Sequence, residues 1–339
     1  MTIIIRARDY APSFIIDLAS RYLNEDRLVV LPTETVYGLA ARACSEHAAR
    51  RLLEVKGLRE SPFTIHVSSL EEVCSLARVS NDVETLLEQL WPGPLTAVLH
   101  AEQSIARGSR SMSGKAGFRI PRHPLTLEVL RRSGPCLMPS ANKHDRPSPV
   151  DVQDVLEDLE DLVDLVIDAG TSEIGIDSTV VDFTETPPLL LRPGALTVEK
   201  LSELGVTLRL PTHLQKVLEK RKYVSSNTSI IAISPGTLTE ILKKIREKLT
   251  EAERNDLKTL LVVSRELFVN LHREHLPKKT SLIVYGSRTL EDVYPGFIYK
   301  VFRYIDKLRF DLVIIECPPK WGLGLAITDR VLAAADHVI

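Results

Sequence analysis

Short apolar runs recur along the first part of this chain and alternate with stretches in which apolar residues repeat at helical spacing. The first pattern is typical of buried or half-buried strands, and the second of amphipathic helices. Successive isoleucines within residues 1–10 predict a first strand. Further strands are predicted at residues 28–31, 63–67, 95–100, 117–120, 136–138, 165–168, 178–181 and 189–191. This order predicts a mixed α/β domain over residues 1–204.

The alternation of apolar runs and helical periodicity weakens after residue 204 and resumes after residue 228. Few large apolar residues occur in regular order between these positions, so we interpret residues 205–228 as a linker. Beyond it, strands separated by helical segments are predicted at residues 230–233, 260–263, 282–285 and 312–315. Strands buried on both faces are typical of a parallel sheet. The sequence therefore predicts a smaller Rossmann-like α/β domain over residues 229–339, although it carries no dinucleotide-binding or P-loop motif.

Composition places the chain among ordinary globular proteins. It has 339 residues, of which 44% are hydrophobic and 26% charged, and this size favours two domains. The N-terminal segment is too short and too charged for a signal peptide or a membrane span, so we expect a cytoplasmic protein without a membrane anchor. The four cysteines, Cys44, Cys74, Cys136 and Cys317, have no metal-ligand spacing, and no protein metal site is predicted.

The net charge of -2 gives no electrostatic reason for the whole molecule to bind a nucleic acid. Positive charge is instead concentrated between residues 103 and 127, where no acidic residue occurs. The cations of this window are Arg107, Arg110, Lys115, Arg119 and Arg122. Such a stretch suits a polyanion, although a solvated basic loop explains the composition equally well. Arg119 favours the first interpretation, because the expected strand 117–120 would hold its guanidinium ready to bind a carboxylate or phosphate.

Other polar residues stand at the ends of expected elements. Lys56 and Arg59 flank a glycine and could converge on a phosphate, but Lys56 could equally be a lysine at a helix C-terminus. His66, on an expected strand, is either a ligand-binding residue or a histidine satisfied within the fold. Ser140 and Asn142 follow a strand, where they either face a ligand at the carboxyl edge of the sheet or complete a turn.

Arg192 follows the apolar run 189–191, and its guanidinium would be costly to bury unpaired. It must therefore reach an internal carboxylate or an anionic ligand. No serine or cysteine sits in a recognisable activating motif, so the sequence predicts no pair of nucleophile and base.

Nine short segments occur in the order found in one family. They are LPTETVYGL at 31–39, the pair Lys56 and Arg59, TIHV at 64–67, WPGPLT at 91–96, FRIP at 118–121, SAN at 140–142, PSP at 147–149, STVVD at 178–182 and LRPGA at 191–195. Together they resemble the YrdC-like family, and specifically its long two-domain form, the L-threonylcarbamoyl-adenylate synthases. The segment LGLAI at 323–327 resembles the end of the second domain, so the similarity covers nearly the whole chain.

The resemblance implies a twisted mixed sheet around an open basic cavity, followed by the Rossmann-like domain. It implies synthesis of L-threonylcarbamoyl-AMP from L-threonine, bicarbonate and ATP, with release of pyrophosphate, for N6-threonylcarbamoyladenosine modification of tRNA. Mg²⁺ would be bound through the ATP phosphates. The product would pass to a tRNA threonylcarbamoyl-transfer complex, and the resemblance allows weak or transient tRNA binding.

The family's site residues carry over by motif. The residues implied on the ATP side are Lys56, Arg59, Ser61, Lys115, Asn142, Ser148, Arg192 and Tyr223. Lys56 and Arg59 would be catalytic. The residues implied on the threonine side are Thr33, Thr35, His66, Arg119, Ser140 and Ser178. Arg119 would bind the carboxylate of the amino acid.

Three departures from the family pattern are visible. The segment between Lys56 and Pro62 is one residue shorter than usual, and Ser61 stands in place of an asparagine. Val150 replaces the usual threonine. The family linker carries a His-Tyr pair that closes over the cavity, and its nearest equivalent here is a lysine followed by Tyr223, which makes Tyr223 the candidate lid residue.

Two other functions fit parts of the sequence. Carbamoyl-adenylate-forming enzymes that use carbamoyl phosphate contain related domains, but normally together with further regions that are not visible here. A non-catalytic RNA-binding module would need only a concave basic surface. Against it stand the near-neutral charge and the Ser, Asn and His positions, which phosphate binding does not require.

Overall fold

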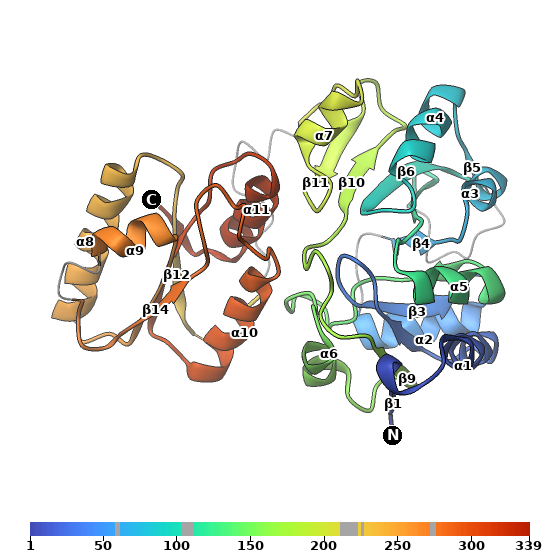
Figure 1. The fold of residues 1–339 in the computed structure, drawn as a ribbon, viewed down its shortest axis with the longest axis horizontal. Helices are drawn as coiled ribbons and strands as arrows, with labels where there is room; N and C mark the ends of the chain where they lie inside the picture. Colours follow the sequence, from blue (N-terminus) through green and yellow to red (C-terminus); the bar gives the residue numbers. More distant parts are fainter. Residues whose placement is uncertain (58–61, 103–110, 211–222, 225–226, 272–275) are drawn as a thin grey trace. The chain divides into compact units, whose positions relative to one another are not determined.

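The computed structural model describes residues 1–57, 62–102, 111–210, 223–224, 227–271 and 276–339. The chain forms two compact units, Met1–Pro211 and Thr212–Ile339 (Figure 1). The division falls inside the predicted linker, much of which lies outside the described residues. Arg209 forms a β-bridge with Leu189, so the start of the predicted linker is attached to the first unit.

The first unit is built on one large mixed sheet. Its strands, in spatial order, are β1 (Ile3–Arg6), β9 (Leu165–Asp168), β2 (Val29–Leu31), β3 (Gly38–Arg42), β8 (Cys136–Leu137), β4 (Ile65–His66), β7 (Lys115–Arg119), β6 (Leu95–Ala101), β10 (Thr179–Asp182) and β11 (Leu189–Arg192), with β5 (Ala77–Arg78) paired to β6. The parallel pairs β4 with β7 and β6 with β10 bring together strands that lie far apart in the sequence. The sheet therefore gathers side chains from most of the unit.

Helices cover this sheet. They are η1 (Ala7–Asp9), α1 (Pro12–Asn24), α2 (Glu46–Lys56), α3 (Leu70–Leu76), α4 (Asn81–Leu90), α5 (Pro124–Ser133), α6 (Val152–Leu159) and α7 (Val198–Glu203). α1 begins with Pro12 in its first turn, where the missing N–H costs nothing, and buries Ile15, Ile16, Ala19 and Leu23 along one face. This face packs with α5 and with β2 and β9 in one hydrophobic core.

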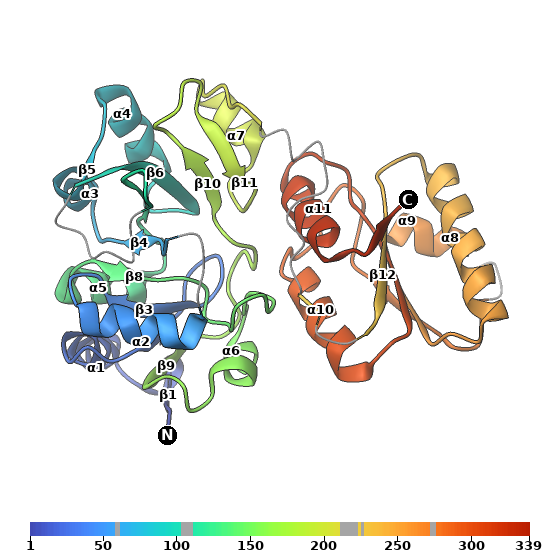
Figure 2. The ribbon, with the colours of Figure 1, turned by 180° about the vertical axis from the view of Figure 1, so that it is seen from behind.

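The second unit contains a parallel sheet. Its strands, in spatial order, are β14 (Thr280–Val284), β13 (Thr259–Val263), β15 (Leu312–Glu316), β12 (Ser229–Ile233) and β16 (His337–Val338). Its helices are α8 (Leu238–Arg254), α9 (Arg265–Leu271), α10 (Phe297–Leu308) and α11 (Leu323–Ala334). In Figure 2, α10 and α11 lie on one side of the sheet and α8 and α9 on the other. The central strands β13 and β15 are consequently buried throughout.

Most predicted strands are found, with their ends shifted by a few residues. β3 has no counterpart among them, because its glycine and alanines have weak strand preference and it is recruited by antiparallel pairing with β2 and β8. The two-residue strands β5 and β16 were not predicted either. Among the described residues, no helix combines the length and the apolar character needed to cross a membrane.

We expect Leu23→Ala to lower the free energy of unfolding of the first unit by about 2–5 kcal/mol, the usual range for a leucine removed from a packed core. Leu23 is 0% exposed at the contact of α1 with the sheet. Denaturant unfolding followed by circular dichroism measures the change. Arg21→Ala, an exposed position on the same helix, is the control. Equal effects of the two substitutions would contradict this assignment of the core.

Candidate active site

Strand register places His66 and Arg119 side by side. His66 ends β4 and Arg119 ends β7, and the two residues are direct partners in the parallel pairing of these strands. Paired residues of neighbouring strands point to the same face of a sheet. Both side chains therefore line one cavity of about 100 Å³ in the first unit.

Further polar residues reach this cavity from other segments. Thr33 comes from the loop between β2 and β3, Ser140 follows β8, Ser178 precedes β10 and Arg192 ends β11. Tyr37, Thr64, Thr96 on β6 and Asp177 add further polar groups to its lining. Of the fourteen residues singled out from the sequence, these segments bring together Thr33, His66, Arg119, Ser140, Ser178 and Arg192.

Arg119 forms a buried ion pair with Glu34. Its Nη2 lies 2.7 Å from Oε1 of Glu34, and its Nε donates to the carbonyl of Gly93 at 3.3 Å. The two residues are 4% and 2% exposed. The other carboxylate oxygen of Glu34 accepts the backbone N–H of Arg122 at 3.0 Å. Burial alone would raise the pKa of Glu34, but the attraction and hydrogen bond of Arg119, together with backbone donors, hold this pKa below its ordinary value.

His66 is buried and uncharged. It is 4% exposed, and its Nδ1 has no hydrogen-bond partner among the residues described. Burial first, and then the nearby positive charge of Arg119, lower the pKa of His66 well below its usual value of 6.5, and the backbone of Thr64 opposes them only in part. The cavity therefore contains a neutral imidazole with a buried polar atom, next to an arginine.

Lys56, predicted at the ATP side, is the last residue of α2 and is 3% exposed. Its ammonium donates to the carbonyl of Ser140 at 2.8 Å, to the carbonyl of Asn142, and to the side-chain oxygen of Asn142 at 3.3 Å. The amide of Asn142 in turn donates to the carbonyl of Arg146 at 2.7 Å. Lys56 therefore fixes the segment that carries Ser140. Arg59 and Ser61 lie outside the described residues.

Hydroxyl groups fix the remaining segments. Thr35 does not line the cavity, but its hydroxyl lies 2.9 Å from that of Thr33, which also bonds the carbonyl of Val36. Ser148 likewise stands behind the lining and donates to Asp177 at 3.1 Å.

Arg192 extends over Ser178. Its Nη2 donates to the carbonyl of Ser178 at 2.8 Å and to the hydroxyl of Ser178 at 3.2 Å, and the same hydroxyl lies 2.8 Å from that of Thr96. The carboxylate or anionic ligand predicted for this guanidinium stays a prediction. The carbonyl contact holds the guanidinium at the cavity.

Lys115, which is predicted at the ATP side, does not line this cavity. The ammonium of Lys115 lies 2.9 Å from Asp182 and 3.0 Å from Glu185. Tyr223 belongs to the second unit, where it is buried and stacks on Phe302 with ring centroids 5.2 Å apart. Its predicted role as a lid stays a prediction.

Carboxylates from other parts of the sequence neutralise the cations of residues 111–127. In addition to the pairs of Lys115 and Arg119, Arg122 lies 2.7 Å from Glu173. Each cation of residues 111–127 is thus paired with an acid from another part of the chain. The composition of this window alone therefore overstated its positive charge, while Arg107 and Arg110 lie outside the described residues.

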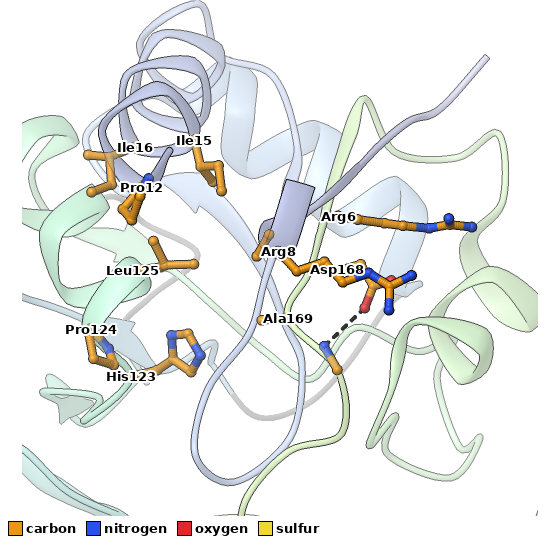
Figure 3. A pocket seen from close by; sticks show the side chains of 12 residues that line it. Arg6, Arg8, Pro12, Ile15, Ile16, His123, Pro124, Leu125, Asp168 and Ala169 are labelled. Atoms are coloured by element: carbon orange, nitrogen blue, oxygen red, sulfur yellow. Dashed lines mark hydrogen bonds between the residues drawn. The ribbon is translucent and has the colours of Figure 1, made fainter. Parts of the chain in front are cut away.

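A larger cavity of about 860 Å³ lies elsewhere in the first unit (Figure 3). Apolar side chains of α1 and α5 form one wall, including Ile15, Ile16 and Leu125, while Arg8 and Asp168 lie opposite. None of the residues predicted from the sequence lines it. Its chemistry gives no reason to place the reaction there.

Glu34, Thr96 and Asp177 were not predicted as site residues from the sequence. Glu34 lies within the segment LPTETVYGL, and an acid inside an otherwise uncharged run was a signal of a buried partner. Its carboxylate does not line the cavity of Arg119. Instead, Glu34 lines a neighbouring cavity of about 240 Å³ with Arg122, His123 and Glu173.

Residues 21–194 match the family Sua5–YciO–YrdC, described as "Telomere recombination". This chain belongs to that family. A threonylcarbamoyl-AMP synthase of Pyrococcus abyssi is 31% identical over 350 residues, which cover 100% of this chain and 99% of that protein. A threonylcarbamoyl-AMP synthase of Bacillus subtilis is 30% identical over 328 residues, which cover 94% and 92% of the two chains.

A solved structure of P. abyssi Sua5 complexed with L-threonine aligns with a TM-score of 0.84 and 29% identity, covering 100% of this chain and 99% of that one. The resemblance to the long, two-domain form is confirmed by these matches over the full chain. They also confirm the predicted fold class, a mixed sheet followed by a separate parallel sheet.

We expect Glu34→Gln to lower the free energy of unfolding by roughly 3–5 kcal/mol at neutral pH, because it leaves the buried guanidinium of Arg119 without its carboxylate. Since the pKa of Glu34 is lowered in the folded state, the stability from this pair is complete above the ordinary pKa of 4.5 and is lost as the pH falls through the lower folded value. Stability of the variant should therefore vary less with pH in this acidic range.

Denaturant unfolding at several pH values measures both effects. Glu173→Gln is the matched control, because its carboxylate pairs with Arg122 but is 69% exposed, and exposed pairs contribute about 0–1 kcal/mol. If the two substitutions lower the free energy of unfolding equally, the buried pair does not stabilise the fold more than the exposed one.

Proposed function

We propose that this chain synthesises L-threonylcarbamoyl-AMP from L-threonine, bicarbonate and ATP, for the modification of tRNA. The observation that carries the proposal is the alignment over the full chain with an L-threonine complex of Sua5, combined with a cavity lined by Arg119, His66, Ser140 and Ser178. Relatives named threonylcarbamoyl-AMP synthase match both units of the chain. These matches favour this function over a carbamoyl-phosphate-using enzyme or an RNA-binding module.

Arg119 is suited to bind the carboxylate of threonine. A guanidinium has five N–H groups, and two of them are engaged by Glu34 and Gly93 among the described residues. The remaining donors belong to a side chain that lines the cavity and is held at its far side by Glu34. A fixed guanidinium can form a bidentate bond with a carboxylate without first becoming ordered.

The hydroxyls of Thr33, Ser140 and Ser178 supply neutral hydrogen-bonding groups around the amino acid. On the ATP side we place Arg59, Asn142, Ser148 and Arg192, with Lys56 holding the segment from Ser140 to Asn142 in place. The assignment of Arg59 rests on its motif alone, and the others rest on the motifs together with the position of each described residue at or next to the cavity.

The reaction can proceed by positioning and charge compensation. The amine of threonine forms a carbamate with bicarbonate, the carbamate oxygen attacks the α-phosphorus of ATP, and pyrophosphate leaves. Phosphoryl and nucleotidyl transfers of this kind depend mainly on alignment and on neutralising the anionic groups.

The described residues include no group of three His, Cys, Asp or Glu side chains arranged to hold a metal. We therefore propose that Mg²⁺ is bound through the ATP phosphates, and no step depends on a protein-held metal. The product would pass to a tRNA threonylcarbamoyl-transfer complex in the cytoplasm.

With ATP and Mg²⁺, we expect pyrophosphate release to require both L-threonine and bicarbonate. A coupled pyrophosphate assay in carbon-dioxide-free buffer measures each requirement separately. Substitution of carbamoyl phosphate for bicarbonate and threonine should give no pyrophosphate. Release of inorganic phosphate, or turnover that is indifferent to threonine, would rule out the proposed reaction.

We expect Arg119→Lys to raise the KM for threonine by about ten- to a hundredfold, because a charge-assisted hydrogen bond contributes roughly 1.5–3 kcal/mol. Lysine keeps a positive charge next to Glu34 but cannot make a bidentate contact. The KM for ATP should stay close to that of the parent protein. Arg122→Lys is the control, since this side chain is 50% exposed. A shift confined to ATP would reverse the assignment of Arg119.

A further inference from the structure

The imidazole of His66 is buried at the cavity, and no step of the proposed reaction has yet been assigned to it. Nδ1 of His66 is buried, has no hydrogen-bond partner among the described residues, and belongs to a side chain that lines the cavity next to Arg119. A buried polar atom without a partner is costly, and native structures retain such atoms mainly where a ligand or water completes them. The position of this atom therefore points to a substrate group.

The charges around His66 determine its protonation. Arg119 on β7 is its nearest cation, and Glu34 pairs with Arg119. On β8 its partner position is Cys136, whose buried thiol has its pKa raised to about 12 and is uncharged. Asp177 and Arg192 are the other charged residues of the cavity lining. Burial and Arg119 keep the imidazole neutral, so the ring can accept a proton.

We propose that Nδ1 of His66 takes the proton that the amino nitrogen of threonine loses when this nitrogen bonds to the carbon of bicarbonate. This inference rests on the proposed function. The ammonium of threonine first loses one proton to solvent, the neutral amine then forms the C–N bond, and the second proton moves from this nitrogen to Nδ1. The C–OH bond of bicarbonate breaks, the imidazolium returns the proton to the departing hydroxide, and water leaves. The carbamate keeps the single negative charge of the bicarbonate, and His66 returns to its neutral form.

Threonine itself makes His66 a stronger base. In the empty cavity Arg119 disfavours the imidazolium, but the carboxylate of threonine bound to Arg119 adds a negative charge at the same place. The pKa of His66 should therefore be higher in the threonine complex than in the free protein. Binding of threonine thus strengthens the base that accepts its proton. In the free protein the imidazole of His66 is neutral.

His66→Asn tests this role. Asparagine keeps a polar atom near the position of Nδ1 that can accept a hydrogen bond, but it cannot take a proton at neutral pH. We expect kcat for threonine-dependent pyrophosphate release to fall by about 10²–10⁴-fold, the usual contribution of general acid–base catalysis, while the Kd for threonine changes little. Calorimetry measures this Kd, and a thermal melt shows that the variant is folded. His66→Gln provides a second variant.

The pH dependence separates catalysis from structure. In the parent protein, activity should fall as the pH falls through the pKa of His66, at a higher pH for kcat than for kcat/KM, because kcat reports the substrate complex. This acidic limb should be absent from the pH profile of His66→Asn, so the ratio of variant to parent rates should rise as the pH falls through the pKa of His66. His123→Asn is the control, since His123 also has a lowered pKa but does not line this cavity.

Unchanged kcat in His66→Asn, or a weaker threonine affinity with kcat intact, would overturn the proposal and leave His66 as a binding residue. An acidic limb that persists in the variant would overturn it as well. These outcomes differ from failure of the proposed function, in which the parent protein itself would show no threonine-dependent release of pyrophosphate.

Discussion

The buried pair of Arg119 and Glu34 joins two segments 85 positions apart in the chain. A guanidinium alone in this position would carry a large desolvation cost, and a carboxylate alone would take up a proton. Together they place a rigid cation at the cavity with little net charge. The direction in which Arg119 presents its remaining donors and the position of the Arg122 backbone both depend on this pair.

A largely compensated cavity suits a zwitterionic amino acid. An uncompensated cluster of cations would bind any anion, including phosphate in place of a carboxylate. Here the charged partner of Arg119 lies behind it, while hydroxyls and a neutral imidazole surround the opening. Selectivity then comes from the geometry of donors and acceptors rather than from total charge.

The periodicity of apolar residues in the sequence was sufficient to predict many of the strands and helices. Strands such as β9 and β15 are continuous apolar runs, and helices such as α1 show a clear buried face. β3 could not be recognised, because its residues have no strand preference of their own and depend on their neighbours. Motif order singled out six residues that line one cavity in the structure, including His66 and Arg119. The sequence could not indicate that Glu34, Asp182 and Glu173 compensate the basic window, since these pairings arise only from tertiary contacts.

The strand order of the second unit has a consequence for protein synthesis. β12 is the first strand of this unit to be made, yet its neighbours in the sheet are β15 and β16, the last two. Ser229 pairs with Leu312, and Ala232 with Val338, so the strand has neither partner in the sheet until residues 312–316 and 337–338 have left the ribosome. The first unit has all of its strands by residue 192 and can fold earlier. A chain interrupted before residue 312 would therefore retain the first unit followed by an unpaired, strongly apolar strand, which is a target for chaperones and proteases.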